Sequence, residues 1–274
     1  MEDENGDLCS DEDGISNIWI DYYQQLFTSS NPSMIEAIVE QIPCSINDEI
    51  IEELLANFTR EEVVVALKQM EPLKAPRPDG LSPLFFQHYW HAVEDDMTKA
   101  VLSCQSTSVI PPSINRTFIT LIPKVKIPTK VSEFRPISLC NIIYKLVSKV
   151  VANRMKGLLP VIISDTRSAF QSNKAILENI LVAFETFHHM KNQKSKKGDF
   201  MALKLDMSKV YDKVEWWFLE LTIRKMGFCN WWVDLIMSCI GSASYQVLVN
   251  GVPKTNFESA ALLKLFDILR NLEH

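Results

Sequence analysis

The hydrophobic pattern of the chain changes its period at Pro111-Pro112, and this change restricts the chain to folds that mix helices with strands. Before the two prolines, apolar residues recur at helical spacing, and the capping-box pattern of residues 59–62 (TREE) predicts the start of one such helix. After them, apolar and polar residues alternate over residues 117–123 (TFITLIP), which predicts a strand. A second strand is predicted over residues 134–139 (FRPISL), and the basic residues 124–130 (KVKIPTK) between them predict a turn. The two strands predict a hairpin, and the expected fold class is α+β.

The remainder of the chain also mixes the two patterns. The acidic composition of the first 17 residues predicts a disordered lead. The pair Asn250-Gly251 predicts a hairpin turn. Asp212, with Glu215 three residues later, predicts a helix cap. Further helices are predicted over residues 18–27, 32–41, 47–55, 84–103, 141–159, 174–190 and 212–226, and further strands over 200–205 and 243–249.

Charge is distributed unevenly along the chain. Residues 1–100 carry 5 Lys and Arg against 21 Asp and Glu, a net charge of −16, whereas residues 101–274 carry 23 against 13, a net charge of +10. Most of the basic excess lies in residues 111–213, whose net charge is +11. A basic region of this size attracts polyanions such as nucleic acids, because binding releases their counterions. The alternative is a solvated basic surface on a protein that is acidic elsewhere.

One carboxylate stands where a metal is commonly held. Residues 202–214 (ALKLDMSKVYDKV) predict a short apolar strand that ends at Asp206. A strand end is rigid and the loop after it is open, and Mg²⁺ prefers carboxylate oxygens while keeping positions free for phosphates. Asp206 is therefore a candidate metal ligand. The alternative is that Asp206 caps the turn that follows it.

The sequence lacks the motifs of several common classes of protein. G-x-x-x-x-G-K-[ST], G-x-G-x-x-G and G-x-S-x-G do not occur, so no P-loop, Rossmann site or serine hydrolase is indicated. The six cysteines form no C-x-x-C pair, which predicts reduced thiols with no disulfide partner. No stretch reads as a secretory signal or a membrane span, so we expect a soluble intracellular protein of the nucleus or cytoplasm, with no membrane partner.

Four segments, taken in their order along the chain, resemble one family. They are residues 72–83 (PLKAPRPDGLSP), 120–156 (TLIPKVKIPTKVSEFRPISLCNIIYKLVSKVVANRMK), 164–171 (SDTRSAFQ) and 202–220 (ALKLDMSKVYDKVEWWFLE). Together they are similar to the reverse transcriptases of non-LTR (LINE-type) retrotransposons, and the similarity is closest to plant elements. It extends over about residues 18–259. Several ordered motifs at matching spacing are more specific than any one of them.

The resemblance implies roles for five residues. Asp206 matches the catalytic carboxylate that binds Mg²⁺ in the family, and Met207 supplies the neighbouring backbone carbonyl. Tyr211 matches the side chain that crowds a ribose 2′-hydroxyl and so favours deoxynucleotides. Lys124 and Arg135 match cations that meet the nucleotide triphosphate, a role that suits their charge.

The resemblance also implies an architecture and partners. The expected fold is that of a right-hand polymerase, with fingers, an incomplete palm and no thumb. The chain would divide into the acidic lead (1–17), a helical segment before the domain (18–58), a partial reverse transcriptase domain (59–259) and a C-terminal tail unlike the family (260–274). The expected partners are an RNA template, a DNA primer and a deoxynucleoside triphosphate.

Some features depart from the family. Its Tyr/Phe-x-Asp-Asp hairpin, which supplies the other metal-binding carboxylates, does not occur, so we expect a truncated copy that is inactive by itself. Arg77 stands where the family usually has Gly, and Val210 where it usually has Ala. Two alternatives to the enzyme remain. One is a residual RNA- or DNA-binding module with aromatic residues among its cations (Phe118, Phe134 and Tyr144), and the other is a translated relic without activity.

Overall fold

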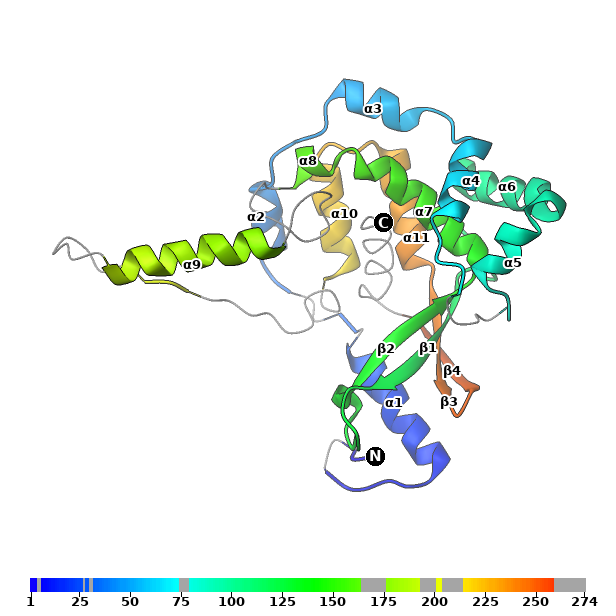
Figure 1. The fold of residues 1–274 in the computed structure, drawn as a ribbon, viewed down its shortest axis with the longest axis vertical. Coiled ribbons are helices and arrows are strands. Elements are labelled where there is room, and N and C mark those ends of the chain that lie inside the picture. Colours follow the sequence, from blue (N-terminus) through cyan, green and yellow to red (C-terminus); the bar gives the residue numbers. More distant parts are fainter. Residues whose placement is uncertain are drawn as a thin grey trace.

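The computed structural model describes residues 1–3, 6–26, 28–29, 32–73, 79–163, 176–192, 201–203 and 214–258. These residues form a helical lobe and, beside it, a lobe built on one four-stranded sheet (Figure 1). The elements are α1 (Glu12–Leu26), α2 (Ile35–Glu40), α3 (Asp48–Leu55), α4 (Arg60–Lys68), α5 (Pro83–His88), α6 (Trp90–Thr107), β1 (Arg116–Pro123), the 3-10 helix η1 (Val131–Glu133), β2 (Phe134–Cys140), α7 (Ile142–Lys156), α8 (Leu159–Ile162), α9 (Ile176–Asn192), α10 (Trp216–Lys225), α11 (Asn230–Gly241), β3 (Ser244–Val249) and β4 (Val252–Glu258). The mixture confirms the expected α+β class.

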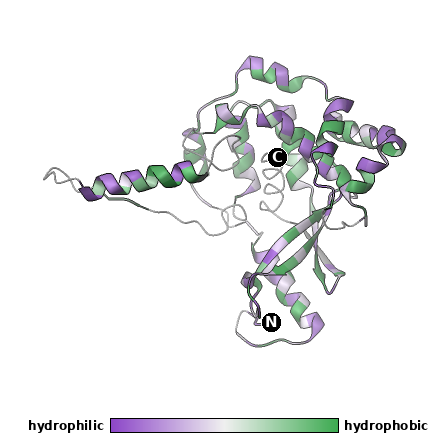
Figure 2. Cartoon of the chain, viewed as in Figure 1, coloured by the Kyte–Doolittle hydropathy of each residue, from purple (hydrophilic) through white to green (hydrophobic). Residues whose placement is uncertain are grey.

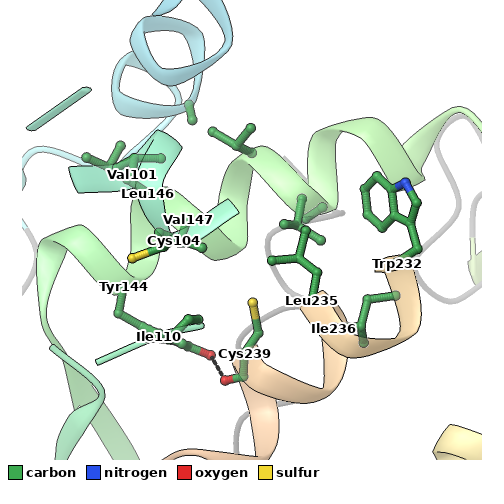
Figure 3. Packing of buried hydrophobic residues seen from close by; sticks show 14 of the residues in the cluster. Val101, Cys104, Ile110, Tyr144, Leu146, Val147, Trp232, Leu235, Ile236 and Cys239 are labelled. Carbon is green, nitrogen blue, oxygen red and sulfur yellow. Dashed lines mark hydrogen bonds between the residues drawn. The ribbon is translucent and has the colours of Figure 1, made fainter. Parts of the chain in front are cut away.

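The core of the helical lobe lies where α4, α6, α7 and α11 meet (Figure 3). Helix α7 contributes most to it, because every one of its residues from Leu146 to Ala152 is buried. Tyr144 lies fully buried in the first turn of α7, and its hydroxyl donates a hydrogen bond to the carbonyl oxygen of Cys239 at 3.0 Å. Hydrophobic residues occur along the helices of this lobe, and also on the sheet and on α9 (Figure 2).

Helix α4 begins as its sequence predicts. Thr59 is the N-cap, its hydroxyl accepts from the backbone N–H of Glu62 at 3.3 Å, and the Glu62 carboxylate accepts from the backbone N–H of Thr59 at 2.8 Å. The reciprocal bonds satisfy two backbone donors that a helix start leaves unpaired. The predicted capping box is confirmed.

A cluster of polar contacts around Arg154 ties α7 to the chain before α4. Its guanidinium makes two bonds to the carboxylate of Glu62, at 2.6 and 2.8 Å, and donates to the carbonyl oxygens of Leu54, Ala56 and Asn57. It also stacks 3.7 Å above the ring of Phe58. Arginine suits this place because its planar fork can satisfy several acceptors at once.

The sheet has the strand order β2-β1-β3-β4. Strands β1 and β2 pair antiparallel, as do β3 and β4, and the two hairpins join through a parallel pairing of β1 with β3. Asn250 (φ 51°) and Gly251 (φ 80°) turn the second hairpin in the left-handed region, as an Asn-Gly pair prefers. Both predicted hairpins are confirmed.

Helix α1 covers one face of this sheet and corrects one expectation. Trp19 and Tyr23 are buried against the sheet, and the rings of Trp19 and Phe134 meet edge to face at 4.6 Å between centroids. The disordered lead predicted over residues 1–17 is wrong for residues 12–17, which lie in α1, and nearer the N-terminus Glu2 forms a β-bridge with Leu8. An acidic composition favours disorder only when no partner orders the segment, and here the sheet lobe is that partner.

Other element boundaries also differ from the prediction. The helix expected over residues 84–103 is two helices, α5 and α6, that meet at Tyr89. Helix α10 has Glu215 as its N-cap residue, so it begins later than the predicted start at Asp212. Asp212 and its predicted pairing with Glu215 lie outside the described residues. Residues 201–203, the described part of the strand expected over 200–205, are in no strand.

Helix α9 projects away from both lobes (Figure 1). Its leucine, isoleucine and phenylalanine side chains from Leu177 to Phe187 are exposed, and none of its residues belongs to the two buried clusters of the described chain. Across the described helices, none combines the length and the apolar character that crossing a membrane requires.

Candidate nucleic-acid interface

The two faces of the sheet differ in character. Side chains of a strand alternate between faces, so Ile119 and its neighbours Tyr245 and Val247 point toward α1, where all three are fully buried. The other face carries Phe118 of β1 and its partner Leu139 of β2, both only half-buried. We call this second face the open face of the sheet.

Two exposed arginines stand at opposite ends of the open face. Arg116 begins β1, and Arg135 lies on β2 directly opposite Ile122. Residues two apart on a strand share a face, so Arg116, Phe118 and Ile122 lie along one row. Arginine beside an aromatic ring is a combination that binds phosphates and stacks on bases.

The prediction from sequence did not include Arg116. The signal was present, because the alternating pattern of residues 117–123 continues backward by one residue and places Arg116 on the face of Phe118. The fold then brings Ser244 of β3 beside Arg116.

Lys124 lies at the tip of the β1–β2 hairpin, where its backbone is fixed. Its N–H donates to the carbonyl oxygen of Glu133 at 2.8 Å, and its ammonium group donates to the carbonyl oxygen of Ser132 at 2.9 Å. An ammonium group has three donors, so the exposed Lys124 side chain can still meet an anion. The structure thus places Lys124 and Arg135 at the same end of one hairpin.

The loop beyond Lys124 is also held in place. The carboxylate of Glu133 accepts from the backbone N–H groups of Thr129, at 2.7 Å, and Lys130, at 3.2 Å. These two hydrogen bonds hold the pKa of Glu133 below its usual range. The tip therefore presents Lys124, Lys126 and Lys130 from a loop whose shape is set by its own hydrogen bonds.

Three aromatic residues were predicted to lie among the cations, and only Phe118 lies on the same face as the arginines. Phe118 is half-buried on the open face. Phe134 instead packs against Trp19 on the face covered by α1, and Tyr144 is fully buried with its hydroxyl bonded inside the helical core. The prediction of Phe134 and Tyr144 as base-stacking residues is wrong, because Phe134 packs against the hydrophobic cluster of the sheet lobe and Tyr144 lies in that of the helical lobe.

The remaining predicted site residues lie outside the described residues. These are Asp206, Met207 and Tyr211, together with the departures Arg77 and Val210. Within the described residues, no three His, Cys, Asp or Glu side chains come together as ligands for a metal ion. Mg²⁺ binding at Asp206 therefore stays a prediction.

The sequence of the chain matches a known family. The reverse transcriptase (RNA-dependent DNA polymerase) family matches residues 122–262, just over half of the chain, so the chain belongs to this family. The matched range begins on β1 and contains the whole β1–β2 hairpin tip, Arg135 and Asp206.

Two curated relatives define the kind of reverse transcriptase. The chain is 26% identical over 250 residues to the transposon TX1 uncharacterized 149 kDa protein of Xenopus laevis, covering 90% of this chain and 19% of the relative. It is 20% identical over 252 residues to the retrovirus-related Pol polyprotein from type-2 retrotransposable element R2DM of Drosophila melanogaster, covering 92% of this chain and 22% of the relative. These relatives support a LINE-type, non-LTR reverse transcriptase domain. The chain spans about a fifth of the length of each relative.

Proposed function

We propose that the chain is the fingers and the first part of the palm of an RNA-directed DNA polymerase of a LINE-type retrotransposon. The observation that supports this most is that the family match contains both the hairpin with its exposed Lys124 and Arg135 and the predicted catalytic residue Asp206. In this proposal the domain occupies residues 59–259, preceded by a helical segment over 18–58, and residues 260–274 are a tail outside it. The affinity to plant elements is part of the same proposal.

The open face and the hairpin tip are the proposed contact surface for nucleic acid. The family binds an RNA template, a DNA primer and deoxynucleoside triphosphates, all of which are polyanions. Arg116, Arg135 and Lys124 offer exposed positive charge along one surface, with Phe118 between them as a stacking surface. Such a surface binds without sequence preference, because phosphates and base faces are common to all nucleotides.

We further propose that these 274 residues do not complete a polymerase site by themselves. Two-metal phosphoryl transfer needs several carboxylates around the ions, and the sequence contains no adjacent acidic pair after Asp96. Mg²⁺-dependent primer extension on an RNA template tests this, with Asp206→Ala beside the wild type. We expect no incorporation from either protein. Incorporation that the substitution abolishes would show that another residue completes the site.

RNA binding tests the proposed surface separately from catalysis. We expect Arg116→Gln/Arg135→Gln to bind a fluorescent single-stranded RNA about tenfold more weakly and to flatten the dependence of binding on salt by roughly one to two in log–log slope. The matched control is Lys68→Gln/Lys99→Gln, which removes two exposed cations from the helical lobe. Equal losses from both double variants would overturn the assignment of the surface.

A second candidate, a nucleic-acid-binding module without catalysis, is favoured by the same open face. Salt-dependent RNA binding without incorporation would support it. If the folded chain bound no RNA at low salt, the remaining interpretation would be a translated relic without activity.

A further inference from the structure

The N-terminal segment of the chain lies against the hairpin tip that we propose to bind nucleic acid. Residues 1–13 contain seven Asp and Glu and no Lys or Arg. The backbone N–H of Glu2 donates to the carbonyl oxygen of Thr129 at 2.7 Å, and its carboxylate forms an ion pair with the ammonium group of Lys130 at 3.3 Å. The acidic segment therefore contacts both the backbone and a cation of the tip.

The segment has a defined shape where it makes this contact. The N-terminal ammonium of Met1 donates to the carbonyl oxygen of Cys9 at 2.6 Å, and the backbone N–H of Cys9 donates to the carbonyl oxygen of Met1 at 2.7 Å. Together with the bridge between Glu2 and Leu8, these bonds hold Met1 and Glu2 beside Leu8 and Cys9. Glu2 is thus presented to the hairpin by the fold of the segment.

A second contact links the acidic segment to the other hairpin of the sheet. Lys254 of β4 forms an ion pair with Glu12 at 3.3 Å and lies 3.9 Å from the carboxylate of Asp13. Both acids stand in the first turn of α1, where negative charge is favoured by the helix dipole. Because β4 and β2 are the two edges of the sheet, carboxylates engage cations near both edges.

We propose that the described residues of this acidic segment, 1–3 and 6–13, form an arm that competes with nucleic acid for the cations of the sheet lobe. The carboxylate of Glu2 occupies Lys130, a cation of the hairpin tip that phosphates would otherwise meet, and those of Glu12 and Asp13 engage Lys254 of β4. Both ion pairs are partly exposed, and exposed ion pairs contribute little stability, so a strand that brings several phosphates can displace the arm. The arm lowers the affinity for nucleic acid and lets it rise when the arm is released. This inference rests on the proposed nucleic-acid binding.

Charge removal at the arm tests the competition. The variant Glu2→Gln/Glu12→Gln/Asp13→Asn is compared with Asp48→Asn/Glu49→Gln/Glu52→Gln, which removes three negative charges from α3 in the helical lobe. Binding of a fluorescent single-stranded RNA is measured by anisotropy at low salt. We expect the arm variant to bind about fivefold more tightly than wild type and the α3 variant to change by less than about twofold.

The outcomes separate this inference from the proposed function. Equal tightening by both variants would show an effect of net charge alone, and no tightening by the arm variant while wild type binds RNA would overturn the arm by itself. Absence of RNA binding by all three folded proteins would overturn the proposed binding function and the arm with it. Hydrogen exchange of the peptide covering residues 1–9 gives a second measurement. We expect faster exchange when RNA saturates the protein, and unchanged exchange would contradict displacement.

Discussion

The two lobes of the molecule bury their residues in different ways. In the helical lobe, α7 is enclosed by neighbouring helices, and polar groups such as the Tyr144 hydroxyl and the Arg154 guanidinium have partners inside or at the border of the core. In the sheet lobe, α1 covers one face only, and the open face keeps Arg116 and Arg135 exposed. A core closed on all sides serves stability, whereas a core closed on one side leaves a surface for a ligand.

The comparison predicts that the largest loss of stability follows truncation in the helical lobe. Trp232 is fully buried, so Trp232→Ala is expected to lower the free energy of unfolding by about 3 to 5 kcal/mol through the lost contacts and the cavity. Urea unfolding followed by circular dichroism measures this. The neighbouring Trp231 is only half-buried, so Trp231→Ala is the matched control with a smaller loss. Equal losses would contradict the assignment of the core.

Removal of Arg154 is expected to cost somewhat less. Arg154→Met leaves the carboxylate of Glu62 and three backbone carbonyls without their shared donor, at a cost of about 2 to 4 kcal/mol. The exposed Lys68→Met on α4 controls for the loss of one positive charge. A loss no larger than that of the control, in the same urea measurement, would show that the cluster is a surface ion pair of little consequence.

Trp232 of the helical core and Trp19 of the sheet lobe differ in whether their side-chain N–H has a hydrogen-bond partner. Trp232 donates to the carbonyl oxygen of Leu54 at 3.0 Å, whereas the buried N–H of Trp19 has no hydrogen-bond partner among the described residues. Trp232→Phe is therefore expected to cost about 1 to 2 kcal/mol more than Trp19→Phe. Thermal and urea unfolding of the two variants check this difference. A larger loss from Trp19→Phe would reverse the comparison.

The smallest expected effect depends on pH. Burial raises the pKa of Glu62, but hydrogen bonds from Arg154 and Thr59 and the charge of Arg154 outweigh it, so the pKa lies below its usual range. A carboxyl whose pKa is lowered by folding adds stability above its unfolded pKa and loses it as the pH falls through the folded pKa. The stability difference between wild type and Glu62→Gln should therefore shrink on acidification from pH 6 towards about pH 3. The exposed Glu53→Gln is the control, and a difference that stays constant with pH would contradict the pairing.

Much of the local structure could be predicted from the sequence. The capping box at Thr59 and the Asn250-Gly251 turn were correctly predicted, because each depends on interactions among residues only a few positions apart. The division between α5 and α6 at Tyr89 could not be predicted in this way, because neither Gly nor Pro marks it.

The candidate site was predicted less completely. Lys124 and Arg135 were predicted together and lie at one end of the same hairpin, although their roles stay predictions. The alternation of side chains already separates Phe134 from Arg135, since neighbours on a strand point to opposite faces. Which of these faces is covered could not be read from the alternation, because it depends on α1, a helix about a hundred residues earlier in the sequence.

The sequence by itself determined the hairpin turns and the capping box, the distribution of charge and the resemblance to reverse transcriptases. The tertiary structure decided that β1 pairs in parallel with β3, that α1 covers one face of the joined sheet, and that an acidic segment meets the basic hairpin tip. The physical reason is the distance along the chain over which each kind of interaction acts. Backbone preferences and caps act over a few residues, whereas the choice of a buried face depends on apolar and charged groups brought together from distant parts of the chain.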